Sequence, residues 1–187
     1  MRLQIIRCVL ALATCFGGAT PVLSAQQFPD TYALDGQALL RNGAGVRTYG
    51  VFNIQVYNAA LYLPAREPRA QAVLEADTPK VVQMHFLRSA SQEDTRAAWQ
   101  HYLEANCRAP CVWPEAGVRQ FSALLPATVQ GESQTFVFRE SGLEVLRNGQ
   151  TLGRVADRHL ARLVLATWLG DVPTTPALKR ALLGGTP

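Results

Sequence analysis

The stretch that decides the fold is GAGVRTYGVFNIQVYNAALYLP, residues 43–64. Its second half is rich in Val, Ile, Phe and Tyr, which predicts a long strand over 51–63 that ends at Pro64. The Asn-Gly-Ala-Gly sequence at 42–45 predicts a turn, because Asn and Gly adopt turn conformations readily. Arg47 lies beside this turn. A guanidinium at the mouth of a half-buried strand is costly unless a polar or anionic group meets it, so Arg47 is the first candidate for a binding residue.

Strands and helices are expected in separate blocks along the rest of the chain. Asn-Gly between two apolar runs near the C-terminus is a strong hairpin signal. Ser91, Asp157 and Thr175 each precede an amphipathic segment and are expected to cap a helix. The expected strands are 38–42, 80–86, 134–139, 143–147 and 151–155, and the expected helices are 68–76, 92–106, 114–125 and two that follow Asp157 and Thr175. This order predicts an α+β fold, an antiparallel sheet with helices packed on one face.

Residues 1–25 differ from the remainder of the chain. A basic start, a short apolar run and a small-residue end at Ser24-Ala25 are typical of a secretory signal peptide, and they predict cleavage after Ala25. A lipoprotein site at Cys15 is the alternative, disfavoured because Thr14 suits it poorly. We therefore expect a periplasmic or secreted protein with one mature domain, residues 26–187, and no membrane span in it.

The charge of the chain does not favour nucleic acid as a partner. The formal net charge of the 187 residues is +4, and the leader removes two arginines and no acidic residue, which leaves +2. No Lys/Arg cluster stands out from ordinary solvated faces. The sequence identifies no protein partner.

Two cysteines remain after the leader, Cys107 and Cys111, spaced C-R-A-P-C. In an exported chain this spacing around a proline favours one small disulfide. A metal site is the rival, but no second cysteine pair supplies further ligands. The three histidines fall on separate elements at no ligand spacing, and no glycine-rich phosphate loop is complete. We expect neither a metal nor a cofactor.

Thr167 lies within the apolar stripe of the helix that follows Asp157. Its hydroxyl is expected to point toward the interior. It can bond to the backbone of the preceding turn, as helical threonines often do, or line a cavity. The spacing alone favours the backbone bond.

Four segments, in order, resemble the bacterial chalcone-isomerase-like family. They are NGAGVR at 42–47, VYNAALYLP at 56–64, FLRSAS at 86–91 and WLGDVP…LKRALLG at 168–184. The resemblance covers nearly all of the mature chain. It implies an open-faced β-sandwich-like sheet whose helices enclose a ligand cleft. In the wider family, plant members cyclise chalcones, and other members bind fatty acids.

The resemblance also implies roles for three residues. Arg47 matches the arginine that polarises the substrate in the enzymes and holds the carboxylate in the fatty-acid binders. Tyr57 falls where plant enzymes have threonine, and the fatty-acid binders pair their arginine with a tyrosine nearby. Thr167 matches a threonine of the enzymes. This match favours a hydroxyl that lines the cavity over one that only bonds to the helix backbone.

The helix after Ser91 departs from the plant pattern. Ungapped counting gives Glu93 and Gln100 where plant enzymes have tyrosine and asparagine. Seven residues are two helical turns, so both are possible cleft-lining residues on one face. An anionic Glu93 cannot replace a phenol that polarises a ketone, and several fixed donors are needed at a developing enolate. We therefore expect no chalcone cyclisation.

Three hypotheses for the function follow. The first is an exported protein that binds a small amphipathic ligand, a carboxylate such as a fatty acid, with Arg47 as anchor, Tyr57 as partner and Thr167 as lining. The apolar chain of the ligand is expected on Met84, Leu163 and Val164 if these residues face the same cleft. The second is an isomerase or intramolecular lyase for an aromatic or enone substrate. The third is a non-catalytic structural or partner-binding domain with a filled cleft.

Overall fold

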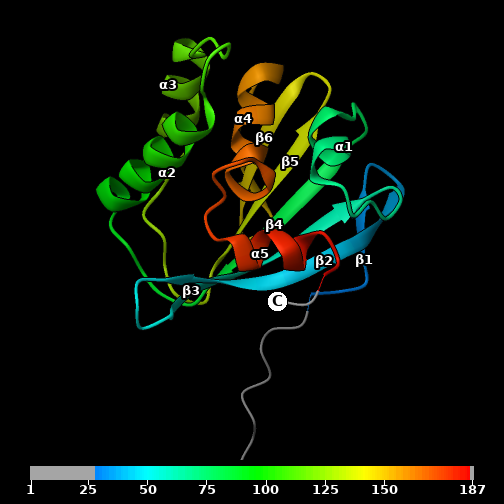
Figure 1. The fold of residues 1–187 in the computed structure, drawn as a ribbon, viewed down its shortest axis with the longest axis horizontal. Coiled ribbons are helices and arrows are strands. Elements are labelled where there is room, and N and C mark those ends of the chain that lie inside the picture. The colour runs from blue at the N-terminus through cyan, green and yellow to red at the C-terminus, as the bar shows by residue number, and fades with distance from the viewer. Residues whose placement is uncertain (1–27, 186–187) are drawn as a thin grey trace, which may run out of the picture.

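A computed structural model describes residues 28–185; the expected leader lies outside these residues. Seven strands form one antiparallel sheet in chain order, and Figure 1 shows the helices gathered over one face of the curved sheet. The α+β expectation is therefore confirmed. The strands are β1 Thr31–Leu34, β2 Gln37–Tyr49, β3 Ile54–Leu63, β4 Lys80–Phe86, β5 Ser133–Arg139, β6 Gly142–Arg147 and β7 Gln150–Val155. The helices are α1 Ala70–Glu75, α2 Gln92–Asn106, α3 Glu115–Ala123, α4 Arg158–Leu169 and α5 Pro176–Leu182.

The main core lies between the sheet and the helices. Helix α4 is its centre, because eight of its residues are buried, including Leu160, Val164 and Trp168. A smaller cluster around Leu39 and Tyr62 lies on the opposite face of the sheet. Within the described residues, no helix is both long enough and apolar enough to cross a membrane.

The three expected helix caps are confirmed. The hydroxyl of Ser91 accepts a hydrogen bond from the Asp94 N–H, the carboxylate of Asp157 from the Leu160 N–H, and the hydroxyl of Thr175 from the Leu178 N–H. Each bond satisfies a backbone donor that the first turn of a helix leaves free. These caps fix where α2, α4 and α5 begin.

The expected turn at 42–45 is wrong, because β2 runs without interruption through this segment to Tyr49. Gly43 and Gly45 are needed for close packing instead of for a turn. A Cβ atom on Gly43 would lie 2.0 Å from the backbone oxygen of Ala181, and one on Gly45 would lie 2.6 Å from the Ala181 side chain. Two glycines on one face of β2 thus let α5 pack directly on the strand.

The true turn lies later, between β2 and β3. Gly50 and Asn53 have φ values of +69° and +49°, and the Asn53 N–H donates to the Gly50 carbonyl. The expectation that the long strand begins at Val51 is therefore wrong, because Val51 and Phe52 lie within this turn. The structure also contains β1, which was not predicted from the sequence.

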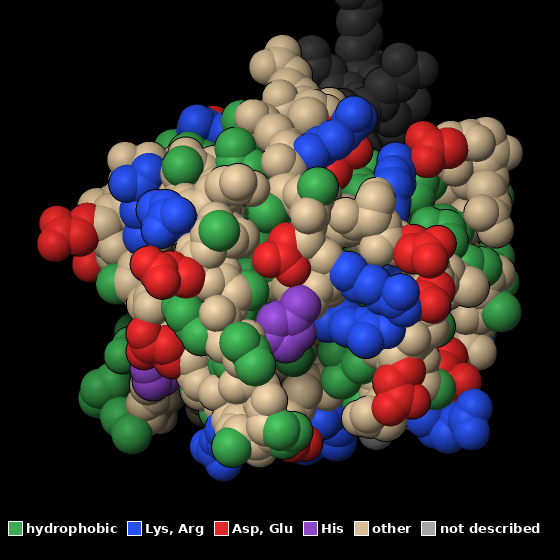
Figure 2. Space-filling view, turned by 90° about the horizontal axis from the view of Figure 1, so that it is seen from above, with side chains coloured by type: hydrophobic (Ala, Val, Ile, Leu, Met, Phe, Trp, Pro, Cys, Tyr) green, Lys and Arg blue, Asp and Glu red, His purple; other side chains and the backbone are tan. Residues whose placement is uncertain are grey.

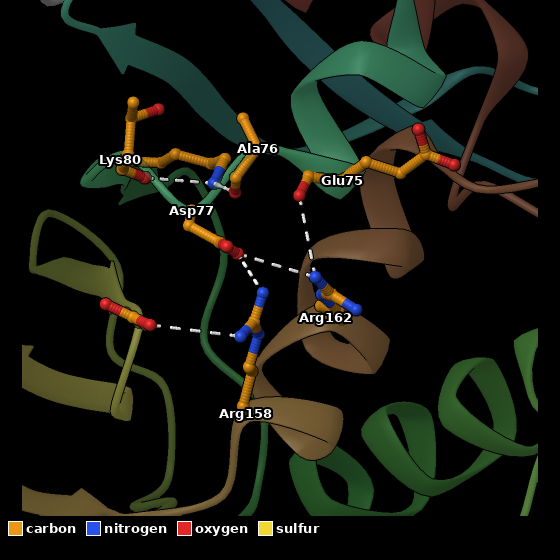
Figure 3. A network of polar contacts seen from close by, with 8 residues as sticks. Glu75, Ala76, Asp77, Lys80, Arg158 and Arg162 are labelled. Atoms are coloured by element: carbon orange, nitrogen blue, oxygen red, sulfur yellow. Dashed lines mark hydrogen bonds and ion pairs between the residues drawn. The ribbon is translucent and has the colours of Figure 1, made fainter.

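A polar network joins the start of β4 to α4 (Figure 3). The buried amine of Lys80 donates to the carbonyl oxygens of Ala76 and Thr78, at 2.5 and 3.0 Å. Asp77 forms ion pairs with Arg158 and Arg162. Burial lowers the pKa of the Lys80 amine to about 8, although Asp77 acts in the opposite direction. The hydrogen-bond acceptors of the Lys80 amine are therefore backbone carbonyls and not a carboxylate.

Basic and acidic side chains are interspersed over the face seen in Figure 2. Blue side chains near its centre lie beside red ones. This face shows no extended surface of one charge. That the chain does not bind nucleic acid stays a prediction.

Candidate functional site

A pocket of about 120 Å³ lies between the sheet and helices α2 and α4. Strands β2, β3 and β4 supply one wall of the pocket, and the two helices supply the other. The segment after α4 adds Thr174. Three of the expected site residues, Arg47, Tyr57 and Thr167, line this pocket together.

The strand register explains why Arg47 and Tyr57 meet. Arg47 of β2 pairs with Tyr57 of β3, and Tyr57 pairs with Phe86 of β4. Residues directly opposite each other in a sheet point to the same face. The three side chains therefore form one row across the sheet at the pocket, although the sequence separates them by up to 39 positions.

Arg47 has few partners for its five N–H donors. Its guanidinium carbon lies 5.5 Å from the ring centroids of both Tyr57 and Tyr102, within cation–π range. Among residues 28–185, its one hydrogen bond is a long contact of 3.4 Å from Nη2 to the Tyr102 hydroxyl. The buried Nε of Arg47 has no hydrogen-bond acceptor among the described residues. Within the same residues, ten side-chain ion pairs occur and Arg47 belongs to none.

Tyr57 is beside Arg47 as expected, but it offers its ring to the guanidinium instead of its hydroxyl. The Tyr57 hydroxyl accepts a hydrogen bond from Nε1 of Trp168 at 3.0 Å. Burial raises the pKa of this hydroxyl above its usual value, against the opposing effect of Arg47. The phenol is therefore neutral near pH 7, and its hydroxyl, which lies close enough to Thr174 for that side chain to lower its pKa, keeps one proton to donate.

Thr167 combines the two roles considered for it. Its hydroxyl donates to the carbonyl of Val164 at 2.8 Å, which is the backbone bond common for helical threonines. Thr167 also lines the pocket. The hydroxyls of two further lining residues, Thr95 and Thr174, are buried without a hydrogen-bond partner among the described residues.

Aromatic side chains form the apolar part of the pocket. The Trp99 ring packs against Trp168 with ring centroids 5.4 Å apart, nearly perpendicular. Met84 lines the pocket as expected. Leu163 and Val164, expected only if they faced the same cleft, do not line the pocket and are instead buried in the main core.

The structure places Glu93 and Gln100 away from the pocket, on the exposed side of α2. Gln100 donates to Glu104, one turn further along the same helix. The face toward the pocket carries instead Thr95, Ala98, Trp99 and Tyr102. The i, i+4, i+7 spacing of Thr95, Trp99 and Tyr102 was the signal that could have identified this face.

The disulfide between Cys107 and Cys111 is confirmed, with Cα atoms 5.2 Å apart. It lies at the end of α2, outside the pocket. Nε2 of His159 comes within 3.5 Å of the Cys111 sulfur and 2.9 Å of the Val112 carbonyl oxygen. Because both sulfurs are bonded to each other, this group of three residues does not offer thiolates to a metal ion.

The pocket suits a ligand with an anionic or strongly accepting head and an apolar body. Two arginines, Arg47 and Arg88, line it with one carboxylate, Asp94. The Asp94 carboxylate already accepts a hydrogen bond from the Ser91 hydroxyl at 2.6 Å. Hydrogen-bond donors therefore outnumber acceptors at the Arg47 end of the pocket, while the aromatic wall offers only apolar contact.

Comparison with known proteins gives a consistent result. The sequence profile described as chalcone isomerase-like matches residues 21–184. Among solved structures, a fatty-acid binding protein of Arabidopsis thaliana has a similar fold, with a TM-score of 0.70 and 17% sequence identity, over 83% of this chain and 90% of that one. No curated protein sequence matches the chain significantly. Because the profile covers most of its length, the chain belongs to the chalcone isomerase-like family.

Proposed function

We propose that this protein binds a small amphipathic carboxylate, such as a fatty acid, with the carboxylate at Arg47 and the apolar part along the aromatic wall. The observation that carries the proposal is Arg47 itself, a permanently charged group in an apolar pocket whose guanidinium has, within the part of the chain that the structure describes, one long hydrogen bond and an unpaired Nε. An arginine cannot lose its proton to escape burial, so an anion is the natural partner for its fork of donors. The fatty-acid binding protein of similar fold supports the same ligand class.

The polar groups around Arg47 support a carboxylate head in particular. The Tyr57 hydroxyl accepts from Trp168 and retains its own proton, so it can donate to one carboxylate oxygen. Thr95 and Thr174 hold further unpaired hydroxyls at the pocket. Buried polar groups without partners are rare in folded proteins, and three such groups among the described residues, Nε of Arg47 and the hydroxyls of Thr95 and Thr174, line this one pocket, which supports a polar ligand group that completes their bonding.

The size of the pocket bears on the apolar part of the ligand. A cavity of roughly 150 Å³ accommodates benzene in another protein. The 120 Å³ available here therefore suits a short alkyl chain or a single ring. A longer alkyl chain of the ligand has to extend out of the pocket mouth or displace side chains of the pocket wall.

Export is part of the proposal. The leader at 1–25 supports a periplasmic or secreted location, and the Cys107–Cys111 disulfide supports an oxidising compartment. Native mass spectrometry of protein purified from an expression host tests both parts. We expect a chain that begins at Gln26 and carries a bound carboxylate of low mass. A lipid-modified Cys15 would contradict the processing, and a chain free of ligand that also fails to take up added octanoate would contradict the binding.

An isomerase is the second candidate, and one observation favours it. The Tyr102 phenol lies next to Arg47, so two tyrosines and an arginine could together polarise a carbonyl. Loss of chalcone absorbance in the presence of the protein tests this. We expect no acceleration over the spontaneous rate, and an acceleration that Arg47→Ala abolishes would favour the isomerase.

A further inference from the structure

The turn between β2 and β3 concentrates apolar side chains at the surface. Among the described residues, eight large hydrophobic side chains are exposed, and four of them fall between Tyr49 and Ile54. The side chains of Val51 and Phe52, at the two central positions of the turn, are 89% and 86% exposed. Single exposed hydrophobics are common on proteins, but such a concentration on one tight turn indicates an interaction surface. We call residues 49–54 the hairpin tip.

The geometry of the turn accounts for this exposure. Gly50 and Asn53 supply the positive φ angles that the turn requires, so no other turn residue is needed at these positions. The two central positions are free to carry polar side chains, as most turns do, yet here they carry Val and Phe. In Figure 1 the connection between β2 and β3 projects at one end of the sheet, away from the helices.

The hairpin tip adjoins the mouth of the pocket. Arg47 precedes it by two residues and Val56 follows it by two, and both line the pocket. The Leu87 N–H bonds to the Val56 carbonyl, which holds the segment after β4 against the base of the hairpin. That segment places the exposed Arg88 at the rim of the pocket.

The charge of this end of the molecule is suited to a lipid surface. Residues 42–63 contain one arginine and no acidic residue. Arg88 adds a second cation at the rim, and Asp94, the one carboxylate among the described residues that line the pocket, accepts a hydrogen bond from Ser91. Aromatic side chains such as Tyr and Phe favour the interface between lipid headgroups and acyl chains, and basic residues are attracted to anionic headgroups.

We propose that the hairpin tip docks on the surface of a lipid bilayer. Val51 and Phe52 enter the boundary between headgroups and acyl chains, and Tyr49 lies at headgroup level. Docking in this way turns the mouth of the pocket toward the bilayer, where amphipathic carboxylates reside. The choice of a bilayer as partner rests on the proposed function, since that function places the ligand in membranes.

Vesicle flotation of the mature, full-length chain tests the proposal. The vesicles are dioleoylphosphatidylcholine with roughly one-fifth dioleoylphosphatidylglycerol, which supplies anionic headgroups. The double variant Val51→Ser/Phe52→Ser is expected to need at least about tenfold more lipid for half-maximal binding, because two apolar side chains no longer leave water. Val112→Ser is the matched control, since Val112 is 78% exposed in the loop between α2 and α3 and lies outside the hairpin tip. It is expected to bind vesicles as the wild type does.

Two further results separate this proposal from the proposed function. Octanoate binding in solution, followed by calorimetry, is expected to be equal in the wild type and the double variant, because neither Val51 nor Phe52 lines the pocket. Loss of vesicle binding in the double variant supports docking even if octanoate does not bind. Failure of the wild type to float with vesicles, or equal flotation of the double variant, overturns it. A wild-type dimer that the double variant dissociates, with no flotation of either, assigns the tip to a second copy and also overturns it.

Discussion

At the scale of single residues, Arg47 stands out because its buried Nε has no hydrogen-bond acceptor among the described residues. Two tyrosine rings lie within 5.5 Å of its guanidinium carbon, and only one of them also meets it through a hydroxyl. Cation–π contact stabilises the charge, but it supplies no acceptor for the N–H donors, and Nε has none among the described residues. The sequence could single out Arg47 because a charge beside an apolar strand is unusual. It could not show that Tyr102 shares this site, because that contact depends on how α2 packs on the sheet.

The hydrogen bond between Trp168 and Tyr57 is expected to contribute to stability. Tyr57→Phe leaves the buried indole N–H of Trp168 without its acceptor, which costs about 1–3 kcal/mol. Tyr102→Phe is the matched comparison, because it removes only a 3.4 Å contact from a half-buried position, and a change within about 0.5 kcal/mol is expected. Urea unfolding measures both. Equal effects of the two variants would mean that the Trp168 bond is not formed.

Lys80 gives a prediction about pH. The pKa of its amine is about 8 in the folded chain, below the value of about 10.4 for an unfolded lysine. Between about pH 8 and pH 10 the unfolded chain therefore binds more protons, and the contribution of Lys80 to the free energy of unfolding rises with pH. Below about pH 8 both states are protonated and the contribution is constant.

The variant Lys80→Met isolates this contribution. Urea unfolding at several pH values measures the free energy of unfolding of both proteins. The difference between wild type and Lys80→Met is expected to change in favour of the wild type from about pH 8 to pH 10. The comparison stops there because tyrosines begin to ionise above it. Parallel pH profiles for the two proteins would show that the amine keeps its ordinary pKa in the fold.

At the scale of elements, most helices and strands could be predicted from the sequence, and the main error was the turn expected at 42–45. The strand 80–86 has the predicted bounds, and the caps at Ser91, Asp157 and Thr175 are in place. Helix caps and hairpin turns are local, so the residues that form them are close in sequence. The glycines at 43 and 45 look the same locally whether they form a turn or admit a helix. Only α5, about 140 residues later, explains them.

Replacement of Gly43 by alanine tests this account of the glycines. The new Cβ atom would overlap the backbone of α5 at Ala181, so β2 and α5 must separate. Overpacking of this kind costs about 1–3 kcal/mol or more. Ala44→Ser, at the exposed position between the two glycines, is the control and is expected to change stability by less than about 0.5 kcal/mol. Thermal unfolding compares them; a Gly43→Ala protein as stable as the control would show that α5 does not pack on the strand so closely.

At the scale of the whole molecule, the site arises where three strands and two helices meet. The sequence placed Arg47, Tyr57 and Thr167 together only through resemblance to a family, since they come from three separate elements. The face of α2 that lines the pocket was missed because ungapped counting against a distant relative does not show which side of the helix packs on the sheet. Residues that complete the site, Thr95, Tyr102, Trp168 and Thr174, are ordinary in sequence and become notable only through burial and unpaired atoms.

An open pocket at Arg47 also separates the three hypotheses for the whole protein. A domain with a purely structural role would fill this space with side chains, as the interiors of proteins are close-packed. The pocket, its aromatic wall and its unpaired donors favour the two hypotheses that involve a ligand. Between these, binding needs only the anchor and the apolar wall, whereas catalysis needs several donors fixed at the reacting atom.

Calorimetric titration with octanoate tests the central claim most directly, on the wild type, Arg47→Ala and the control Arg119→Ala. Arg119 is exposed on α3 outside the pocket, so its replacement removes the same charge without changing the site. A charge-assisted hydrogen bond contributes about 1.5–3 kcal/mol, so Arg47→Ala is expected to bind octanoate at least about tenfold more weakly, and Arg119→Ala as the wild type does. Equal affinity of the wild type and Arg47→Ala would contradict the claim that Arg47 holds the carboxylate of the ligand.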